Sequence, residues 1–234
     1  MTQFGFRTVG AAYSQSPVTA LVGFGGFAFA GKDTAADLLG RDHGWSKTFM
    51  SEPLRDALLE LNPLVPVAYD FERTADGIAK VFHYSRTSDT NDARQIVHVR
   101  YRDLYEEIGY DESKKNPEVR GLLQRLGTEV GRRMFGPNAW VDLVFSRISK
   151  LRSAGTSVAV TGIRFANELE RVHADGGVSV WIERPGFRPA NDHSSENSLS
   201  ASDFDLTIVN DGTVEELAAK LAGTLATSST PSLA

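Results

Sequence analysis

The sequence predicts an α/β fold in which helices cover both faces of a mainly parallel central sheet. Two observations support this prediction. Strand-like and helix-like segments alternate through the last third of the chain, a pattern typical of parallel sheets. Near the beginning, an apolar strand-like run leads through a glycine-rich loop, residues 26–34, into a helix-like segment. A chain of 234 residues is long enough for one sizeable domain with insertions.

Composition narrows the class of protein. The formal net charge of −5 gives no overall attraction to nucleic acid or to acidic membranes. The absence of cysteine excludes disulfides, thiolate metal sites and a cysteine nucleophile. The longest apolar run, residues 18–30, is too short to span a membrane, and the first residues lack the pattern of a signal peptide. We therefore expect a soluble, cytoplasmic protein.

The first quarter of the chain predicts two strand–helix pairs. A helix at residues 52–61 is supported by Pro53 in its first turn, where proline is tolerated, and by Asn62-Pro63, which ends it. Residues 62–115 are harder to interpret, with one strand expected at 95–101. The expected elements before this region are strands at 19–25 and 45–50 and helices at 32–39 and 52–61.

The pattern sharpens from Asn116, a good helix N-cap that is followed by proline at the first helical position. Apolar residues then keep helical spacing through residue 130, and a second helix is expected at 138–151. The last third predicts strands at 157–163, 178–183 and 205–209 and helices at 167–175 and 213–225. We expect one domain at 19–225 with an insertion or substrate region at about 62–137, a flexible arm at 1–18 and a disordered tail at 226–234.

The loop at 26–34 fits the phosphate-binding pattern G-x-x-x-x-G-K, with Gly26, Gly31 and Lys32 in place. Its backbone N–H groups and the helix N-terminus behind them favour phosphate, and Lys32 can reach the outer phosphates. A glycine-rich turn with a solvated lysine is the alternative. Phe27 and Phe29 either pack beneath the loop or lie against a base. The predicted ATP phosphate-binding residues are Gly26, Ala30, Gly31, Lys32, Asp33 and Thr34.

Beyond this loop, several segments resemble the phage-type deoxynucleoside monophosphate kinases, whose phosphate-loop lysine is followed by Asp-Thr. The matching segments occur in the family's order: GKDTAADLL, FMSEPLRDALLEL, LLQRLGTEVGRRMFGPNAWVDLV, TGIRFANELERVHADGGVSVWIERPG, DHSSE and FDLTIVNDGTVEEL. The resemblance covers most of residues 19–225 apart from 62–115. It implies a three-layer P-loop NTPase fold, ATP as co-substrate, Mg²⁺ as cofactor and, for a phage-encoded protein, the host cytoplasm.

On the helix that begins at Pro117, Gln124, Thr128 and Arg132 recur at every fourth position and form one polar stripe. This stripe is either a solvated helix face or a binding wall for a nucleoside monophosphate. In the second interpretation, Gln124 meets a base edge and Arg132 grips a phosphate with its planar fork. Arg55 occupies the basic position of the resembling segment and is a further substrate-binding candidate.

Arg164 follows the strand expected at 157–163, and the carboxyl ends of parallel strands are where ligands bind. It is therefore a candidate phosphate clamp, with a salt bridge to Glu168 as the alternative. The resembling family has an acidic residue two positions earlier, where this chain has Gly162. Thr34 is consequently the predicted Mg²⁺ contact, with Asp33 or a residue of the middle region to share that role.

These observations predict a kinase that transfers the γ-phosphoryl group of ATP to deoxynucleoside monophosphates. Lys32, Arg132 and Arg164 are the predicted catalytic residues, and the resemblance places Asn210, Asp211 and Gly212 beside the adenine. Charges are nearly balanced in residues 84–105, so nucleic acid is not expected as a partner, whereas a homodimer stays open. The alternatives are another small-molecule kinase, such as a dephospho-coenzyme-A kinase, and a nucleotide-binding module without catalysis.

Overall fold

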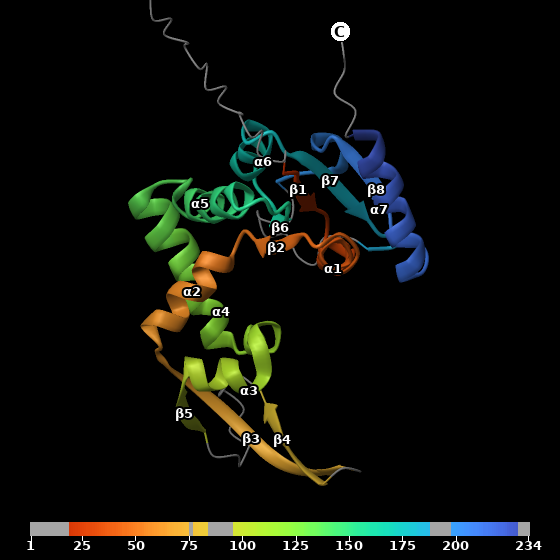
Figure 1. The fold of residues 1–234 in the computed structure, drawn as a ribbon. Helices are drawn as coiled ribbons and strands as arrows, with labels where there is room; N and C mark the ends of the chain where they lie inside the picture. Colours follow the sequence, from red (N-terminus) through yellow and green to blue (C-terminus); the bar gives the residue numbers. More distant parts are fainter. Residues whose placement is uncertain (1–18, 75–76, 84–95, 188–197, 229–234) are drawn as a thin grey trace, which may run out of the picture.

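The computed structural model describes residues 19–74, 77–83, 96–187 and 198–228. Figure 1 shows an α/β unit with the larger sheet at the top and a smaller unit below it, with α2 and α4 lying between the two sheets. The chain passes from the α/β unit into the smaller unit after β2 and returns at α5. The expected arm at 1–18 and the end of the expected tail lie outside the described residues.

The central sheet contains five parallel strands in the order β2-β6-β1-β7-β8. Its strands are β1 (Leu21–Gly25), β2 (Ser46–Phe49), β6 (Val158–Ile163), β7 (Val178–Glu183) and β8 (Leu206–Val209). All five residues of β1 are buried, as expected for a central strand covered on both faces. The predicted parallel sheet is therefore confirmed.

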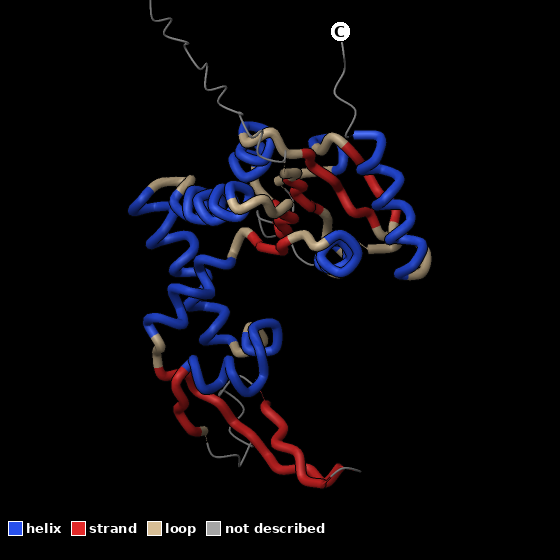
Figure 2. Tube along the Cα trace, viewed as in Figure 1, coloured by secondary structure: helices blue, strands red, loops and turns tan. Residues whose placement is uncertain are grey.

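Two pairs of helices cover the two faces of this sheet. Apolar residues of α1 (Lys32–His43) and α7 (Val214–Ser228) share one buried cluster with the strands. Those of α5 (Ala139–Ser153) and α6 (Ala166–Ala174) share another cluster, built on alternate strand residues. Figure 2 shows these helices around the strands. The three-layer architecture follows from this division of the core.

The smaller unit has its own sheet and its own core. Its antiparallel strands, in the order β4-β3-β5, are β3 (Leu64–Thr74), β4 (Gly77–His83) and β5 (Val97–Arg100). Its helices are α2 (Glu52–Leu61), α3 (Tyr101–Ser113) and α4 (Pro117–Gln124). The fully buried Leu58, Val65, Tyr101 and Val119 lie in one cluster that brings α2, α3, α4 and the sheet together. Of these strands, sequence analysis predicted only β5.

One α-helix was expected from Pro117 through residue 130, and this expectation is wrong beyond Gln124. The chain continues as a π-helix, η1 (Arg125–Phe135), in which hydrogen bonds run from i to i+5. Trp140 packs against this segment, since its Nε1 donates to Gly127 O at 3.0 Å. A Cβ on Gly131 would lie 1.9 Å from the same Nε1, so only glycine permits this approach.

The remaining boundaries are close to those expected. Asn116 caps α4 as predicted, because its Oδ1 accepts from the backbone N–H groups of Glu118 and Val119. The 3-10 helix η2 (Ala201–Asp203) precedes β8, and α7 ends at Ser228 rather than at residue 225. None of the helices in the described ranges is long and apolar enough to cross a membrane.

Candidate functional site

The glycine-rich loop connects β1 to α1 at the carboxyl end of the central sheet, and glycine is required where it enters the helix. Gly31 has φ 103°, in the left-handed region, and serves as N-cap without a side-chain cap. A Cβ there would lie 2.5 Å from Asn210 Nδ2, which donates to Ala30 O at 2.8 Å. The predicted adenine-side residue Asn210 therefore holds the loop itself.

The two loop phenylalanines have different environments. Phe27 packs edge-on against Trp181, with ring centroids 5.3 Å apart, and joins the buried cluster beneath the loop. Phe29 has φ 62° and is 82 % exposed. Lys32 Nζ donates to Phe27 O at 2.6 Å, so the lysine side chain folds back over its own loop. The two alternatives for these rings thus separate: Phe27 packs beneath the loop, and Phe29 presents its ring to solvent.

Asp33 is bound to the end of β6. Thr161 Oγ1 donates to Asp33 Oδ1 at 2.9 Å, and Lys47 Nζ lies 3.3 Å from the same oxygen. The neighbouring Gly162 has φ 79°, and the pairing of β1 with β6 skips it. Such a bulge in the left-handed region favours glycine, which is the residue found at this position. A carboxylate at this strand end comes instead from Asp33 of α1.

Arg164, Glu168 and Arg132 come together beside the loop. Glu168 is 6 % exposed, and its Oε2 accepts from the backbone N–H of Arg164 at 2.8 Å. Its Oε1 accepts from Arg132 Nη2 at 3.0 Å. Burial raises the pKa of Glu168, while the Arg164 backbone N–H and the Arg132 charge oppose that rise. The Arg164 turn and loop residues 26–28 line the same small cavity, of about 20 Å³.

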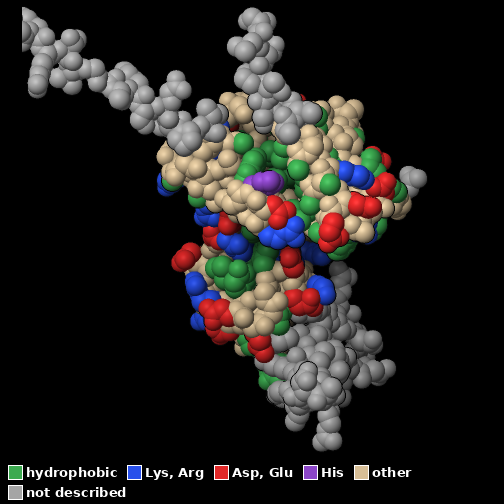
Figure 3. All heavy atoms as spheres, turned by 45° about the vertical axis from the view of Figure 1, so that its right-hand side comes forward, with side chains coloured by type: hydrophobic (Ala, Val, Ile, Leu, Met, Phe, Trp, Pro, Cys, Tyr) green, Lys and Arg blue, Asp and Glu red, His purple; other side chains and the backbone are tan. Residues whose placement is uncertain are grey.

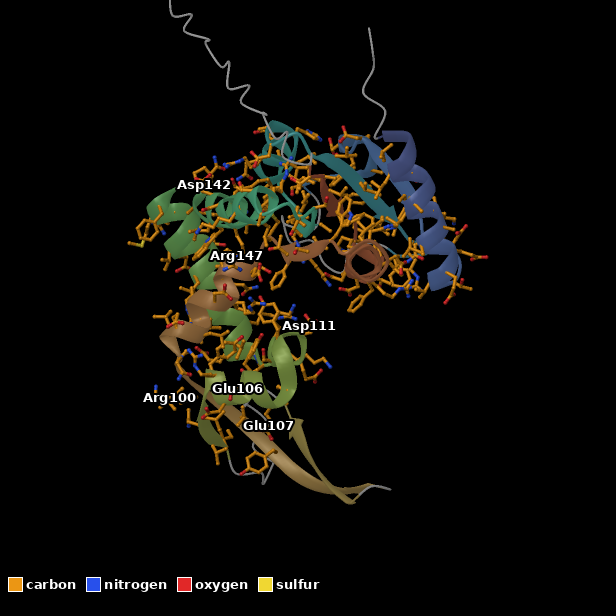
Figure 4. All side chains as sticks on the ribbon, viewed as in Figure 1. Arg100, Glu106, Glu107, Asp111, Asp142 and Arg147 are labelled. Atoms are coloured by element: carbon orange, nitrogen blue, oxygen red, sulfur yellow. The ribbon has the colours of Figure 1, made fainter. Side chains whose placement is uncertain are left out.

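Arg55, by contrast, lies in a separate ion-pair network. Its Nη2 is 3.0 Å from Glu52 Oε1 and 2.7 Å from Asp56 Oδ1. Arg147 of α5 contacts the same two carboxylates at 2.9 Å each. Figure 4 shows Arg147 between α5 and α2, and Thr48 of β2 donates a further hydrogen bond to Glu52. This network joins the smaller unit to the α/β unit.

A second contact joins the units at the far end of α3. The rings of Phe49, the last residue of β2, and Tyr110 have centroids 5.7 Å apart. Burial raises the pKa of Tyr110 to about 12, although a hydrogen bond between its side chain and Ser51 opposes that rise. Figure 4 labels the adjacent Asp111 at this end of α3. The end of β2 and the start of α2 are therefore in contact with both α3 and α5.

Four other residues of the predicted site are exposed. Gln124 and Thr128 are exposed, and among the described residues neither side chain has a hydrogen-bond partner. Asp211 and Gly212 are exposed after β8, where Asp211 pairs with Lys220 Nζ at 2.5 Å. On the face in Figure 3, basic and acidic side chains are interspersed around the constriction between the units.

Sequence reasoning missed the dual role of Glu168. Its position, three residues after the N-cap Phe165, is the spacing of a capping carboxylate, and this signal was readable. Its ion pair with Arg132, 36 residues away, has no local signal. The hydrogen bond from Thr161 to Asp33 was hidden for the same reason.

Comparison with known proteins adds independent evidence. The family model described as deoxynucleotide monophosphate kinase matches residues 64–221. The deoxynucleotide monophosphate kinase of Enterobacteria phage T4 is 25% identical over 242 residues, covering 88% of this chain and 98% of that protein. The deoxynucleotide monophosphate kinase of Escherichia phage RB69 is 33% identical over 104 residues, covering 44% of this chain and 43% of that protein.

Solved structures are more distant. The dephospho-CoA kinase from Campylobacter jejuni covers 90% of this chain and 97% of its own, with 12% identity and a TM-score of 0.42. The APS kinase CysC of Mycobacterium tuberculosis, as a Cys556Ala mutant, covers 90% and 99%, with 18% identity and a TM-score of 0.37. Structural similarity with TM-scores this low carries no argument about residues or substrates.

Proposed function

The chain belongs to the deoxynucleotide monophosphate kinase family, and we propose that it transfers the γ-phosphoryl group of ATP to a deoxynucleoside monophosphate. The observation that carries this proposal is the strand–loop–helix at residues 21–43, with Gly31 as N-cap and no side chain capping the helix. Uncapped N–H groups at a helix start, at the carboxyl end of parallel strands, are a natural site for phosphate.

Phosphoryl transfer depends on positioning the two substrates and on neutralising charge spread over the phosphates. In our proposal the loop backbone and Lys32 bind the phosphates of ATP. Lys32 Nζ then exchanges its contact with Phe27 O for a phosphate oxygen. Arg132 and Arg164 bind the acceptor phosphate and the group in transfer, on the side of the loop where the Arg164 turn lies.

We further propose that the exposed Gln124 and Thr128 form a wall of the acceptor site and that Asn210, Asp211 and Gly212 border the adenine. Support for the second assignment comes from Asn210, whose side chain donates to the loop at Ala30 O. The insertion or substrate region at 62–137 then corresponds to the smaller unit. Phage relatives support the host cytoplasm as the place of action.

A Mg²⁺ ion would find oxygen donors at the start of α1. Mg²⁺ prefers oxygen ligands and usually combines one or two carboxylates with substrate phosphates. Asp33 Oδ2 has no hydrogen-bond partner within the described residues, and Thr34 lies in the same helical turn. No cluster of three acidic or histidine side chains in the described ranges could hold a metal alone. This donor set fits an ion that is held largely by the phosphates, whose charge it would neutralise.

A coupled ADP-release assay with ATP and each deoxynucleoside monophosphate tests the proposal. Lys32→Ala should lower turnover by about 100-fold or more while the fold is kept, because the phosphates lose their only loop cation among residues 26–34. Lys150→Ala, at an exposed lysine of α5, is the matched control and should not change turnover. Undiminished activity of Lys32→Ala would refute the assignment of the loop.

The same assay separates the alternatives. Turnover with dephospho-coenzyme A, and with none of the monophosphates, would favour the other small-molecule kinase. ATP binding without turnover of any acceptor would favour a nucleotide-binding module.

A further inference from the structure

The carboxylate of Glu168 links two parts of the candidate site that are far apart in the sequence. Its Oε2 accepts from the backbone N–H groups of Arg164 at 2.8 Å and of Phe165 at 3.2 Å. The second of these groups belongs to the N-cap of α6, whose N–H the helix itself leaves unpaired. Its Oε1 is used differently, because it accepts from Arg132 Nη2 on η1. One buried side chain thus determines both the turn after β6 and the position of Arg132.

Arg132 is held by two contacts that act in different directions. Its Cζ lies 3.7 Å from the centroid of the Phe165 ring, so the guanidinium stacks on the ring face. The ion pair with Glu168 uses Nη2. Among the described residues, Nε and Nη1 have no hydrogen-bond partner, and the side chain is 27 % exposed. The stacked plane and the single anchored nitrogen leave the rest of the donor fork open to an oxyanion.

We propose that Glu168 is a positioning residue that holds Arg132 so that its remaining nitrogens bind the phosphate of the acceptor nucleotide. This inference rests on the proposed function for its substrate and names a residue that the proposal did not include. The same carboxylate holds the Arg164 turn, which borders the phosphate loop. Glu168 therefore determines the spacing between the loop and Arg132, across which the phosphoryl group must pass.

A purely structural role for Glu168 is the alternative, since a buried carboxylate that caps a helix also stabilises the fold. The Glu168→Gln variant separates the two roles. Its amide oxygen can still accept from the two backbone N–H groups and so keep the cap. Its NH₂ group then faces Arg132 and cannot accept from it, which releases the arginine.

Steady-state kinetics and calorimetric binding of the four deoxynucleoside monophosphates test the proposal. For Glu168→Gln we expect the KM and the Kd for the monophosphate to rise by about 10-fold. The reason is that the ion pair that orients Arg132 toward the phosphate is lost. The KM for ATP should stay unchanged, and the urea unfolding midpoint should fall only slightly, because the helix cap is kept and the released Arg132 is partly exposed. Glu170→Gln, the same change at an exposed position of α6, is the matched control and should leave every value unchanged.

A double-mutant cycle with Arg132→Ala completes the test. If Glu168 acts through Arg132, the effects of the two substitutions on monophosphate affinity are not additive. An unchanged monophosphate Kd in Glu168→Gln, or additive effects in the double variant, would overturn the proposal. So would a variant that only lowers the unfolding midpoint. Monophosphate binding by the wild type without turnover would refute the proposed function alone, because the binding comparison still decides the role of Glu168.

Discussion

Replacing Gly31 with alanine tests the structure of the phosphate loop directly. At φ 103° an alanine costs about 1–2 kcal/mol in backbone strain. Its Cβ would lie 2.5 Å from Asn210 Nδ2, so that side chain must move and lose its hydrogen bond to Ala30 O, worth about 1 kcal/mol. We therefore expect Gly31→Ala to lower the free energy of unfolding by about 2–3 kcal/mol and to weaken ATP binding.

Urea unfolding and calorimetric titration with ATP measure the two effects. Gly223→Ala is the control, since a Cβ there meets nothing within 4 Å in α7 and alanine raises helix stability by up to about 1 kcal/mol. In an Asn210→Ala background, Gly31→Ala should cost only the strain, about 1–2 kcal/mol. If Gly31→Ala unfolds at the wild-type urea concentration and binds ATP normally, the described loop geometry is wrong.

Three further predictions concern the two loop phenylalanines, Arg55 and Asp205. Phe27→Ala should lower the free energy of unfolding by about 2–4 kcal/mol through loss of packing on the core, whereas Phe29→Ala at the exposed position should change it by less than about 0.5 kcal/mol. Equal losses of unfolding free energy for the two variants, measured by urea unfolding, would contradict the difference in burial between the two rings. Arg55→Ala should lower the melting temperature without raising the KM for the monophosphate, because Arg55 belongs to the ion-pair network through which Arg147 joins the units. A selective rise in that KM would place Arg55 in the site instead.

Burial alone raises the pKa of Asp205, but hydrogen bonds from Ser179 and the charge of His173 outweigh it and lower the pKa overall. A carboxyl with a lowered folded pKa stabilises the fold above its unfolded pKa and loses that contribution as pH falls. Asp205→Asn should therefore be less stable than wild type at pH 7 in urea unfolding. The difference should shrink below about pH 4, and a constant difference would contradict the assignment.

The sequence predicted the α/β unit well because its signals are local. Buried parallel strands are short apolar runs, and the loop at residues 26–34 has glycines at the spacing of the phosphate-binding pattern. The smaller unit was largely missed, since its antiparallel strands pair residues with mixed polarity. The π-helix η1 was also missed, and its contact with Trp140, whose Nε1 donates to Gly127 O, comes from outside the segment. Local periodicity alone cannot distinguish such a segment from an α-helix.

The same limit applies to the candidate arginines, which look equivalent in the sequence. Arg55 shares two carboxylates with Arg147, so two positive and two negative charges cancel within that network. Releasing Arg55 to a phosphate would leave the two carboxylates with Arg147 alone, so one negative charge there would lack a compensating cation, which is costly. Arg132 need give up no contact, because its pair with Glu168 uses one nitrogen and the other two have no partner in the part of the chain that the structure describes. We therefore expect an acceptor phosphate to bind at Arg132 beside α6, where a guanidinium can add hydrogen bonds without leaving its carboxylate, rather than at the junction of the two units.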